Sequence, residues 1–257
     1  MNRFLFSLGM VATLTLAFVG RLRADEKAHK QVRQSTVWIA ASHSSGSGAL
    51  VDAKRRLVVT AAHVIKGHNR VLVFAPVDND ELVQLPDRPA TSKWRESYLD
   101  DPARHQREGR ATIGRVVAYD AVKDLAILQL DADLQSLVPI KLATALPKER
   151  DGLHIVGNPG GRPLFNYSCG ITRTVGPIDV RFKEGGECHF EGIRFSSECW
   201  FGNSGGPVTN EAGELVGVVS CKRNATGTAV ALPEIRRLLE SIRADVKQLQ
   251  PRSPFRP

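Results

Sequence analysis

Hydrophobic and polar positions alternate over short stretches through most of the chain, and turn-forming residues separate these stretches. Gly, Pro, Asn or Asp stands between most of them, and the TNEAGE step at 209–214 predicts a hairpin turn. Many short strands with regular turns predict an all-β sandwich or barrel. The segments are STVWIAA, GSGALVD, RLVVTAAHVI, RVLVFAPV, ATIGRVVAYD, LAILQL, LHIVGNP, VTNEAGELVGVVS and TGTAVAL.

The segment 233–250, PEIRRLLESIRADVKQLQ, departs from this pattern. Its apolar residues recur at helical spacing, and Pro233 suits a first helical turn. We predict an amphipathic C-terminal helix here; a coiled-coil seam fits less well because the pattern is short. Residues 251–257 are predicted to be a disordered tail. The apolar positions are Ile235, Leu238, Leu239, Ile242 and Val246.

Two further regions bear on the domain organisation. Residues 77–110 are charged and weakly periodic, which predicts an elaborated loop between two strands. A boundary between two β lobes is expected near 131–150, a stretch that contains Pro139 and Pro147.

The N-terminus has the form of a secretory signal peptide. The basic Arg3 precedes an apolar run, and RLRAD then places the small residue Ala24 before an expected cleavage site. The alternative is a retained membrane anchor, because the run approaches the minimum spanning length of about 17 residues and has basic flanks. We expect a signal at 1–24, a domain at 25–250 and an exported protein, periplasmic, envelope-associated or secreted.

The chain of 257 residues is long enough for one large all-β domain or two small lobes. Its net charge of +8 is spread without interleaved aromatic residues or a nucleic-acid motif, so we expect a solvated basic surface and no nucleic-acid partner. Such a surface also suits peripheral association with an anionic envelope. We expect no cofactor, and no metal, because six histidines show no ligand spacing: His29, His43, His68, His105, His154 and His189.

The heptapeptide FGNSGGP at 201–207 is the strongest candidate for chemistry. Taken alone, it reads as a polar loop. A serine becomes a nucleophile when an imidazole takes its proton and a buried carboxylate orients that imidazole. The chain offers His63 in VVTAAHVI and Asp124 in AVKDLAILQL as partners for Ser204, although each alone is more often structural.

Together, TAAHV, DLAIL and GNSGGP, in this order, resemble the trypsin-like serine proteases of the chymotrypsin fold. GNSGGP, GSGALV at 46–51 and GNPGG at 157–161 are more similar to the HtrA branch. The resemblance covers about residues 32–232. It implies two six-stranded antiparallel β-barrel lobes of chymotrypsin type, followed by the C-terminal helix.

The resemblance also implies an activity, that of a serine endopeptidase acting on protein or peptide substrates through an acyl-enzyme. Ser204 would attack the scissile carbonyl, His63 would transfer its proton, and Asp124 would orient His63. The oxyanion hole would lie at Gly202, Asn203 and Ser204, formed by the backbone N–H groups of the first and last of these.

The sequence departs from the family pattern in two places, so two family properties are not expected here. Trypsin-type enzymes usually carry Asp where this chain has Asn203, and no Ile-Val-Gly-Gly segment follows a basic cleavage site. We therefore expect that no activating cleavage of the trypsin type is needed. Only 50 residues follow Pro207, and the last strands and the helix need them, so no PDZ domain fits.

The substrate pocket implied by the resemblance has two candidate walls, Glu198, Cys199, Trp200 and Phe201 on one side and Ser220 and Cys221 on the other. Glu198 would favour a basic residue before the cut, unless it is an exposed loop residue. Trp200 and Phe201 would instead crowd the pocket and favour small or medium apolar residues.

Four cysteines without a CxxC motif suggest two disulfides in an exported protein, and three connectivities are possible. Cys199–Cys221 is preferred because both flank the expected pocket, and it leaves Cys169–Cys188 to tie neighbouring strands.

Two other functions share features of this sequence. A catalytically silent protease-fold binding protein with an occluded pocket would keep the fold, with Trp200 as a candidate plug. An esterase of the α/β-hydrolase type would need Ser, then acid, then His in chain order, whereas here His63 comes first.

Overall fold

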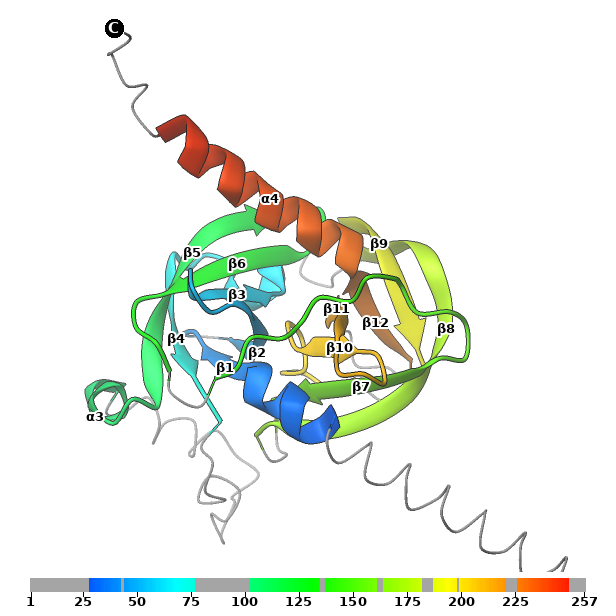
Figure 1. The fold of residues 1–257 in the computed structure, drawn as a ribbon, viewed down its shortest axis with the longest axis horizontal. Coiled ribbons are helices and arrows are strands. Elements are labelled where there is room, and N and C mark those ends of the chain that lie inside the picture. Colours follow the sequence, from blue (N-terminus) through cyan, green and yellow to red (C-terminus); the bar gives the residue numbers. More distant parts are fainter. Residues whose placement is uncertain are drawn as a thin grey trace, which may run out of the picture.

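A computed structural model describes residues 28–42, 44–76, 102–134, 137–160, 164–181, 187–197, 199–220 and 226–249. It contains two closed six-stranded antiparallel barrels that lie side by side, with a C-terminal helix across them (Figure 1). The predicted all-β fold with two six-stranded lobes and a terminal helix is therefore confirmed. The expected signal at 1–24 and tail at 251–257 lie outside the described residues.

The first barrel closes in the order β1-β2-β3-β6-β5-β4. Valines and leucines that alternate along each strand fill its interior, as the period-two pattern requires. β1 is buried on both faces, because Val37 and Ile39 point into the barrel while Trp38 and Ala40 pack towards the second barrel. The strands are β1 (Thr36–Ala40), β2 (Ser45–Asp52), β3 (Leu57–Thr60), β4 (Arg70–Phe74), β5 (Ala111–Asp120) and β6 (Leu125–Leu130).

The second barrel closes in the order β10-β11-β12-β9-β8-β7. β8 and β9 form its longest hairpin, which pairs out to Arg181 and Glu187 and reaches beyond the barrel wall towards the first barrel (Figure 1). The strands are β7 (Gly152–Gly157), β8 (Asn166–Arg181), β9 (Glu187–Phe195), β10 (Pro207–Thr209), β11 (Leu215–Val219) and β12 (Gly227–Ala231).

Helix α4 (Leu232–Leu249) begins directly after β12 and packs against strands of both barrels. Ile235 and Leu239, one helical turn apart, are buried in the same apolar cluster as the core of the second barrel. The apolar face of the predicted amphipathic helix is therefore buried against the barrels. Among the described residues, no helix has both the length and the apolar character needed to span a membrane.

Two α-helical segments were not predicted. Residues 28–35 are helical, and Val32 from this helix packs with Trp38 between the barrels. α3 (Pro102–Arg107) lies within the stretch expected to be a loop, so that expectation is wrong for its last part, while residues 77–101 lie outside the described residues.

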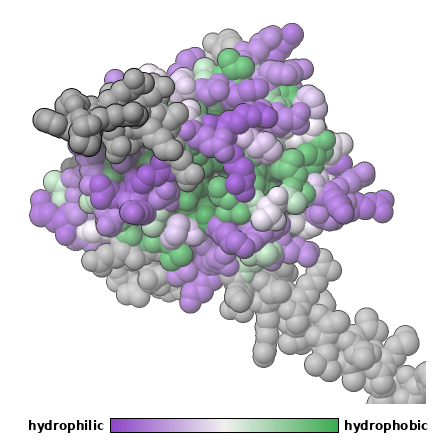
Figure 2. Space-filling view, turned by 45° about the horizontal axis from the view of Figure 1, so that its top comes forward, coloured by the Kyte–Doolittle hydropathy of each residue, from purple (hydrophilic) through white to green (hydrophobic). Residues whose placement is uncertain are grey.

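Hydrophilic residues dominate the molecular face in Figure 2, and hydrophobic ones gather near its middle. Among the described residues, few large apolar side chains are exposed, and Phe201 is by far the most exposed at 71%. Phe201 belongs to the turn that carries Ser204.

Candidate active site

His63 is held on a short, rigid element of the first barrel. β3 ends at Thr60, and a 3-10 helix, η1 (Ala62–Ile65), follows at once, with Val64 and Ile65 buried. Burial of these neighbours fixes the backbone, so the position of His63 is defined. The His63 side chain keeps 29% of its surface exposed, which leaves one edge of the imidazole towards solvent.

Asp124 lies in the turn between β5 and β6 and is almost fully buried. Its φ of 52° is a left-handed conformation that Asp tolerates better than most residues. Asp124 Oδ1 accepts hydrogen bonds from the backbone N–H of His63, at 3.0 Å, and from its Nδ1, at 2.9 Å. The hydroxyl of Ser220 donates to Oδ2 at 2.5 Å.

These bonds fix the protonation pattern of the pair. An ionised carboxylate only accepts hydrogen bonds, so the proton of neutral His63 lies on Nδ1 and Nε2 is the basic nitrogen. The negative charge of Asp124 is also felt nearby: burial raises the pKa of Tyr119, and the charge of Asp124 raises it further. Asp124 is thus placed to stabilise a charged imidazole.

The Ser204 turn depends on glycines that no other residue can replace. Gly205 has a φ of 85°, and a Cβ there would lie 2.0 Å from the carbonyl oxygen of Ser47. At Gly46, an added Cβ would meet both Val64, at 2.6 Å, and the carbonyl oxygen of Ser204, at 2.8 Å. The Ser204 turn therefore lies directly against the segment that carries His63.

A buried polar network supports this turn from beneath. The Ser47 hydroxyl donates to the carbonyl oxygen of Gly202 at 2.8 Å and accepts from the backbone N–H and the side-chain amide of Asn158, at 2.9 and 3.1 Å. Sequence reasoning missed the roles of Ser47 and Asn158, although both lie in the GSG and GNP motifs. The available signal was a Ser or Asn at a motif position, because such a residue needs hydrogen-bond partners when it is buried.

The peptide between Phe201 and Gly202 has a fixed orientation. The carbonyl oxygen of Phe201 accepts a hydrogen bond of 2.8 Å from the N–H of Gly160. Because C=O and N–H of a trans peptide point in opposite directions, the N–H of Gly202 points away from Gly160. Gly202 itself has a φ of 102°, and a Cβ there would lie 2.2 Å from the carbonyl oxygen of Asn158.

Asn203 is buried beneath the same turn. Its N–H donates to the carbonyl oxygen of Trp200 at 3.0 Å, and its carbonyl oxygen accepts from Gly206 at 2.9 Å. Its side-chain Oδ1 has no hydrogen-bond donor among the described residues and would lie 2.5 Å from a Cβ at Gly157.

The second barrel also holds the turn that carries Asp124. The thiol of Cys188 donates to the carbonyl oxygen of Ala121 at 3.2 Å, and the N–H of His189 donates to that of Val122 at 2.8 Å. Both come from β9, so the long β8–β9 hairpin braces the Asp124 turn from the neighbouring barrel.

The expected pocket residues are only partly described. Cys199 is buried, Trp200 is half-buried and Phe201 is mostly exposed, while Glu198 and Cys221 lie outside the described residues. The exposure of Phe201 does not fit a buried wall residue. Ser220, expected in the opposite wall, instead directs its hydroxyl to Asp124.

The expected Cys169–Cys188 disulfide is wrong, because neither residue forms a disulfide. Cys188 pairs with Val180, eleven positions along β8 from Cys169, far beyond the 7 Å Cα separation that a disulfide allows. Cys199 is disulfide-bonded. Because Cys221 lies outside the described residues, the Cys199–Cys221 pairing stays a prediction. Across the described part of the chain, no three His, Cys, Asp or Glu side chains are grouped to hold a metal ion.

The chain is similar to one protein family and to several named proteases. The family model of the trypsin-like peptidase domain matches residues 46–218. The chain is 28% identical over 191 residues to the "Putative serine protease HhoA" of Synechocystis sp., covering 73% of this chain and 40% of the relative. It is 27% identical over 179 residues to a "Probable periplasmic serine endoprotease DegP-like" of Buchnera aphidicola, covering 68% and 29%. The chain thus spans less than half the length of these relatives.

Solved structures share the fold. The Rv3671c protease of M. tuberculosis in its active form aligns with a TM-score of 0.59 at 23% identity, covering 82% of each chain. The HtrA-type protease AlgW with a tripeptide aligns with a TM-score of 0.61 at 22% identity, covering 84% of this chain and 62% of that one. At these identities, the likeness concerns the fold alone.

Proposed function

The chain belongs to the trypsin-like peptidase domain family, and from that premise we propose that it is a serine endopeptidase with Ser204, His63 and Asp124 as its catalytic triad. The observation that carries the proposal is the buried carboxylate of Asp124 on Nδ1 of His63, which no ordinary surface histidine possesses. Its substrates would be proteins or peptides.

The proposed reaction proceeds through an acyl-enzyme. Nε2 of His63 takes the proton of the Ser204 hydroxyl as the serine oxygen attacks the scissile carbonyl. The imidazolium then donates that proton to the leaving amine, and the acyl group remains on Ser204. Water, activated by the same imidazole, releases the acid and restores the hydroxyl. Asp124 stays ionised and stabilises the imidazolium in both half-reactions.

The N–H groups of Gly202 and Ser204 would bind the oxyanion. The hydrogen bond from Gly160 to the carbonyl oxygen of Phe201 supports this role, because it fixes the peptide that bears the first donor. Removal of one such donor typically costs a rate factor of about 10²–10³. Asn203 lies between the two donors and would contribute through its buried side chain.

The same turn supports activity without an activating cleavage. A trypsin-type N-terminus needs a carboxylate to pair with, and Asn203 offers only an amide, packed against Gly157. We propose that the turn is instead held by Ser47 and Asn158. We also propose export after removal of residues 1–24; in support, one relative is named periplasmic.

The proposal is tested by digestion of denatured casein with the full chain, beside Ser204→Ala and the matched control Ser241→Ala on exposed α4. We expect cleavage by the wild type and Ser241→Ala, and none by Ser204→Ala. Cleavage that survives Ser204→Ala would contradict the proposal. A folded wild type that cleaves nothing would favour the silent binding protein instead.

A further inference from the structure

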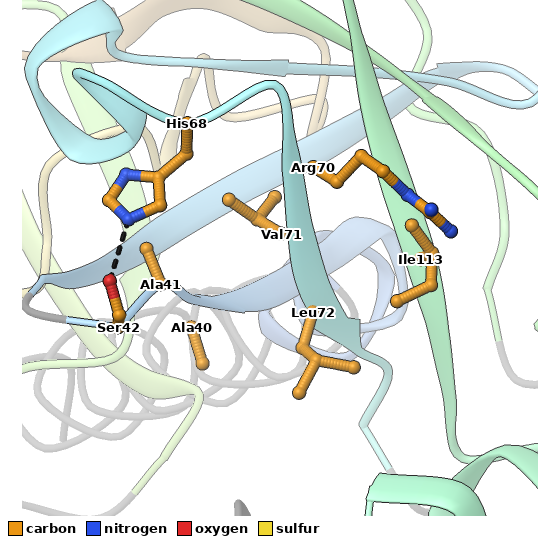
Figure 3. Close-up of a pocket in the computed structure, with 8 residues that line it drawn as sticks. All are labelled: Ala40, Ala41, Ser42, His68, Arg70, Val71, Leu72 and Ile113. Atoms are coloured by element: carbon orange, nitrogen blue, oxygen red, sulfur yellow. Dashed lines mark hydrogen bonds between the residues drawn. The ribbon is translucent and has the colours of Figure 1, made fainter.

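A cavity of about 310 Å³ lies on the first barrel, outside the catalytic residues. It forms where β1 and β4 diverge after their last pair, Ala40 with Leu72. In Figure 3, Ser42 and His68 stand on one side and Arg70 and Ile113 on the other, with the apolar side chains between them. The lining residues are Ala40, Ala41, Ser42, His68, Arg70, Val71, Leu72 and Ile113.

The rim of this cavity is cationic. The Arg70 side chain is 63% exposed and approaches Asp131 only to 3.9 Å. Arg115 binds that same carboxylate more closely, through Nε at 2.6 Å, and lowers the pKa of Asp131. Lys66 is also exposed beside His68. One acid thus faces two arginines, and the guanidinium of Arg70 can bind a further carboxylate.

The polar wall of the cavity is a hydrogen-bonded pair, His68 and Ser42. Nδ1 of His68 lies 3.0 Å from the carbonyl oxygen of Lys66, which only accepts, so Nδ1 carries the proton. Nε2 and the Ser42 hydroxyl form a hydrogen bond of 2.8 Å. This pair repeats part of a nucleophile–base pattern, but a backbone carbonyl supplies no charge to stabilise an imidazolium. A binding role therefore fits the pair better than a catalytic one.

The cavity is connected to the active site along two segments. One runs from His63 through η1 to His68, five residues later. The other runs back from Ser47 to Ser42. The backbone N–H of Ser47 donates to the carbonyl oxygen of Ser204. Five residues of extended chain span at most about 17 Å. Ser44 joins both segments, because its hydroxyl donates to the carbonyl oxygen of Val64 at 2.6 Å.

We propose that this cavity is an exosite that binds a segment of the polypeptide substrate in which acidic residues flank an apolar side chain. The apolar side chain would enter between Ala41 and Val71, and a neighbouring carboxylate would pair with Arg70. The inference rests on the proposed function, since the occupant is a substrate whose scissile bond lies at Ser204. The proximity of the cavity to Ser204 favours a substrate segment as the occupant, and the cationic rim favours acidic residues in that segment.

Binding is measured first without cleavage, in the full chain carrying Ser204→Ala. The probe is a fluorescein-labelled peptide of alternating Glu, Leu, Asp and Phe, and fluorescence anisotropy gives its Kd. A counterpart with Lys at each acidic position serves as the comparison peptide. We expect the acidic peptide to bind at least about tenfold more tightly than the basic one.

Two substitutions address the cavity itself. Arg70→Glu reverses the rim charge, and Ala41→Phe fills the apolar floor. Arg173→Glu on β8 and Ala212→Phe in the β10–β11 turn are matched controls, because both positions are exposed on the second barrel. We expect each cavity variant to weaken acidic-peptide binding by about tenfold, and the controls to bind as the parent does. Melting temperatures confirm that all four variants are folded.

A kinetic experiment separates this inference from the proposed function. With the active chain, Arg70→Glu and Ala41→Phe should raise KM for a protein substrate that contains the acidic–apolar segment, and leave a short peptide thioester unaffected. Equal binding of the two peptides, or unchanged binding in both cavity variants, would overturn the exosite. If the wild type does not cleave the thioester, the proposed function would be overturned instead. The measured preference for the acidic peptide would still stand.

Discussion

The two barrels contribute to the candidate active site in different ways. The first barrel supplies His63 and Asp124, whose side chains bond directly to each other, with Ser220 of the second barrel as a third partner. The second supplies Ser204 on a turn whose shape is fixed by backbone hydrogen bonds and by glycines with positive φ. The first half therefore depends on a charged pair of side chains, and the second on backbone conformation supported by the Ser47–Asn158 network.

This difference predicts how substitutions in each half will affect the rate and the stability. A substitution in the His63–Asp124 half removes a charge or a hydrogen bond and should change the rate more than the stability. A Cβ added in the Ser204 half meets backbone oxygen atoms that cannot move away, so it should lower the stability of the fold as well as the rate.

The largest effect is expected from Asp124→Asn. An amide can present its NH₂ group to His63, which favours the wrong tautomer and leaves the imidazolium unstabilised. We expect kcat/KM for a short peptide thioester to fall by about 10⁴-fold with little change in melting temperature. Asp120→Asn is the control, since Asp120 ends β5 just before this turn and accepts a hydrogen bond from the N–H of Lys123, not from His63. An equal loss in both variants would contradict the assignment.

Gly205→Ala should mainly destabilise the fold. Its Cβ would lie 2.0 Å from the carbonyl oxygen of Ser47 and 2.3 Å from the Thr60 hydroxyl, at a φ of 85°. We expect the free energy of unfolding in urea to fall by about 3–5 kcal/mol. Gly213→Ala shares a positive φ but meets only the flexible side chain of Gln31, so it should lose about 1 kcal/mol. Equal losses would show that φ, not the close contact, determines the cost.

Ser47→Ala tests the network beneath the turn. It leaves the carbonyl oxygen of Gly202 and the N–H of Asn158 without their shared partner, so we expect a loss of about 1–3 kcal/mol in unfolding free energy. Because the turn relaxes, kcat for the thioester should fall by about tenfold. Ser45→Ala, two residues earlier on β2, should leave both quantities close to the wild type. A wild-type kcat in Ser47→Ala would separate the network from catalysis.

The smallest effect concerns Glu234, which joins α4 to the Asp124 turn. Burial alone would raise the pKa of this carboxyl, but the N–H of Glu191, Arg237 and Lys123 together lower it below its usual value. A lowered folded pKa contributes stability above the unfolded pKa, and that stability is lost as pH falls through the folded pKa.

Glu234→Gln should therefore cost about 1–2 kcal/mol of unfolding free energy at pH 7. Against the wild type, the difference should shrink as the pH of the urea titrations is lowered towards 3. Glu240→Gln on the exposed face of α4 serves as the control, with little change at either pH. A pH-independent difference for Glu234→Gln would show that packing, not charge, accounts for the loss.

The sequence predicted the fold and the candidate triad because their signals are local. Short alternating strands predict the barrels, and His63 and Ser204 each lie in a compact motif. The helical stretch at 28–35 was missed because only two apolar residues, Ala28 and Val32, mark its buried face, and β1 begins directly afterwards.

The remaining features depend on contacts between distant residues. Ser47 and Asn158 are 111 positions apart, and nothing in either motif alone indicates that they share a hydrogen bond. The Cys169–Cys188 pairing was wrong because the register of the long β8–β9 hairpin, which separates the two thiols, cannot be read from spacing. The hydrogen bonds by which β9 holds the Asp124 turn likewise join residues that are distant in the sequence.

The most direct test of the triad is covalent labelling of the full chain with a fluorophosphonate probe, beside Ser204→Ala and His63→Ala. Such a probe reacts with a serine whose hydroxyl is activated by a neighbouring base. The account predicts one labelled peptide, containing Ser204, and loss of labelling in both variants. Labelling that persists without His63, or a folded wild type that takes up no probe, would contradict it.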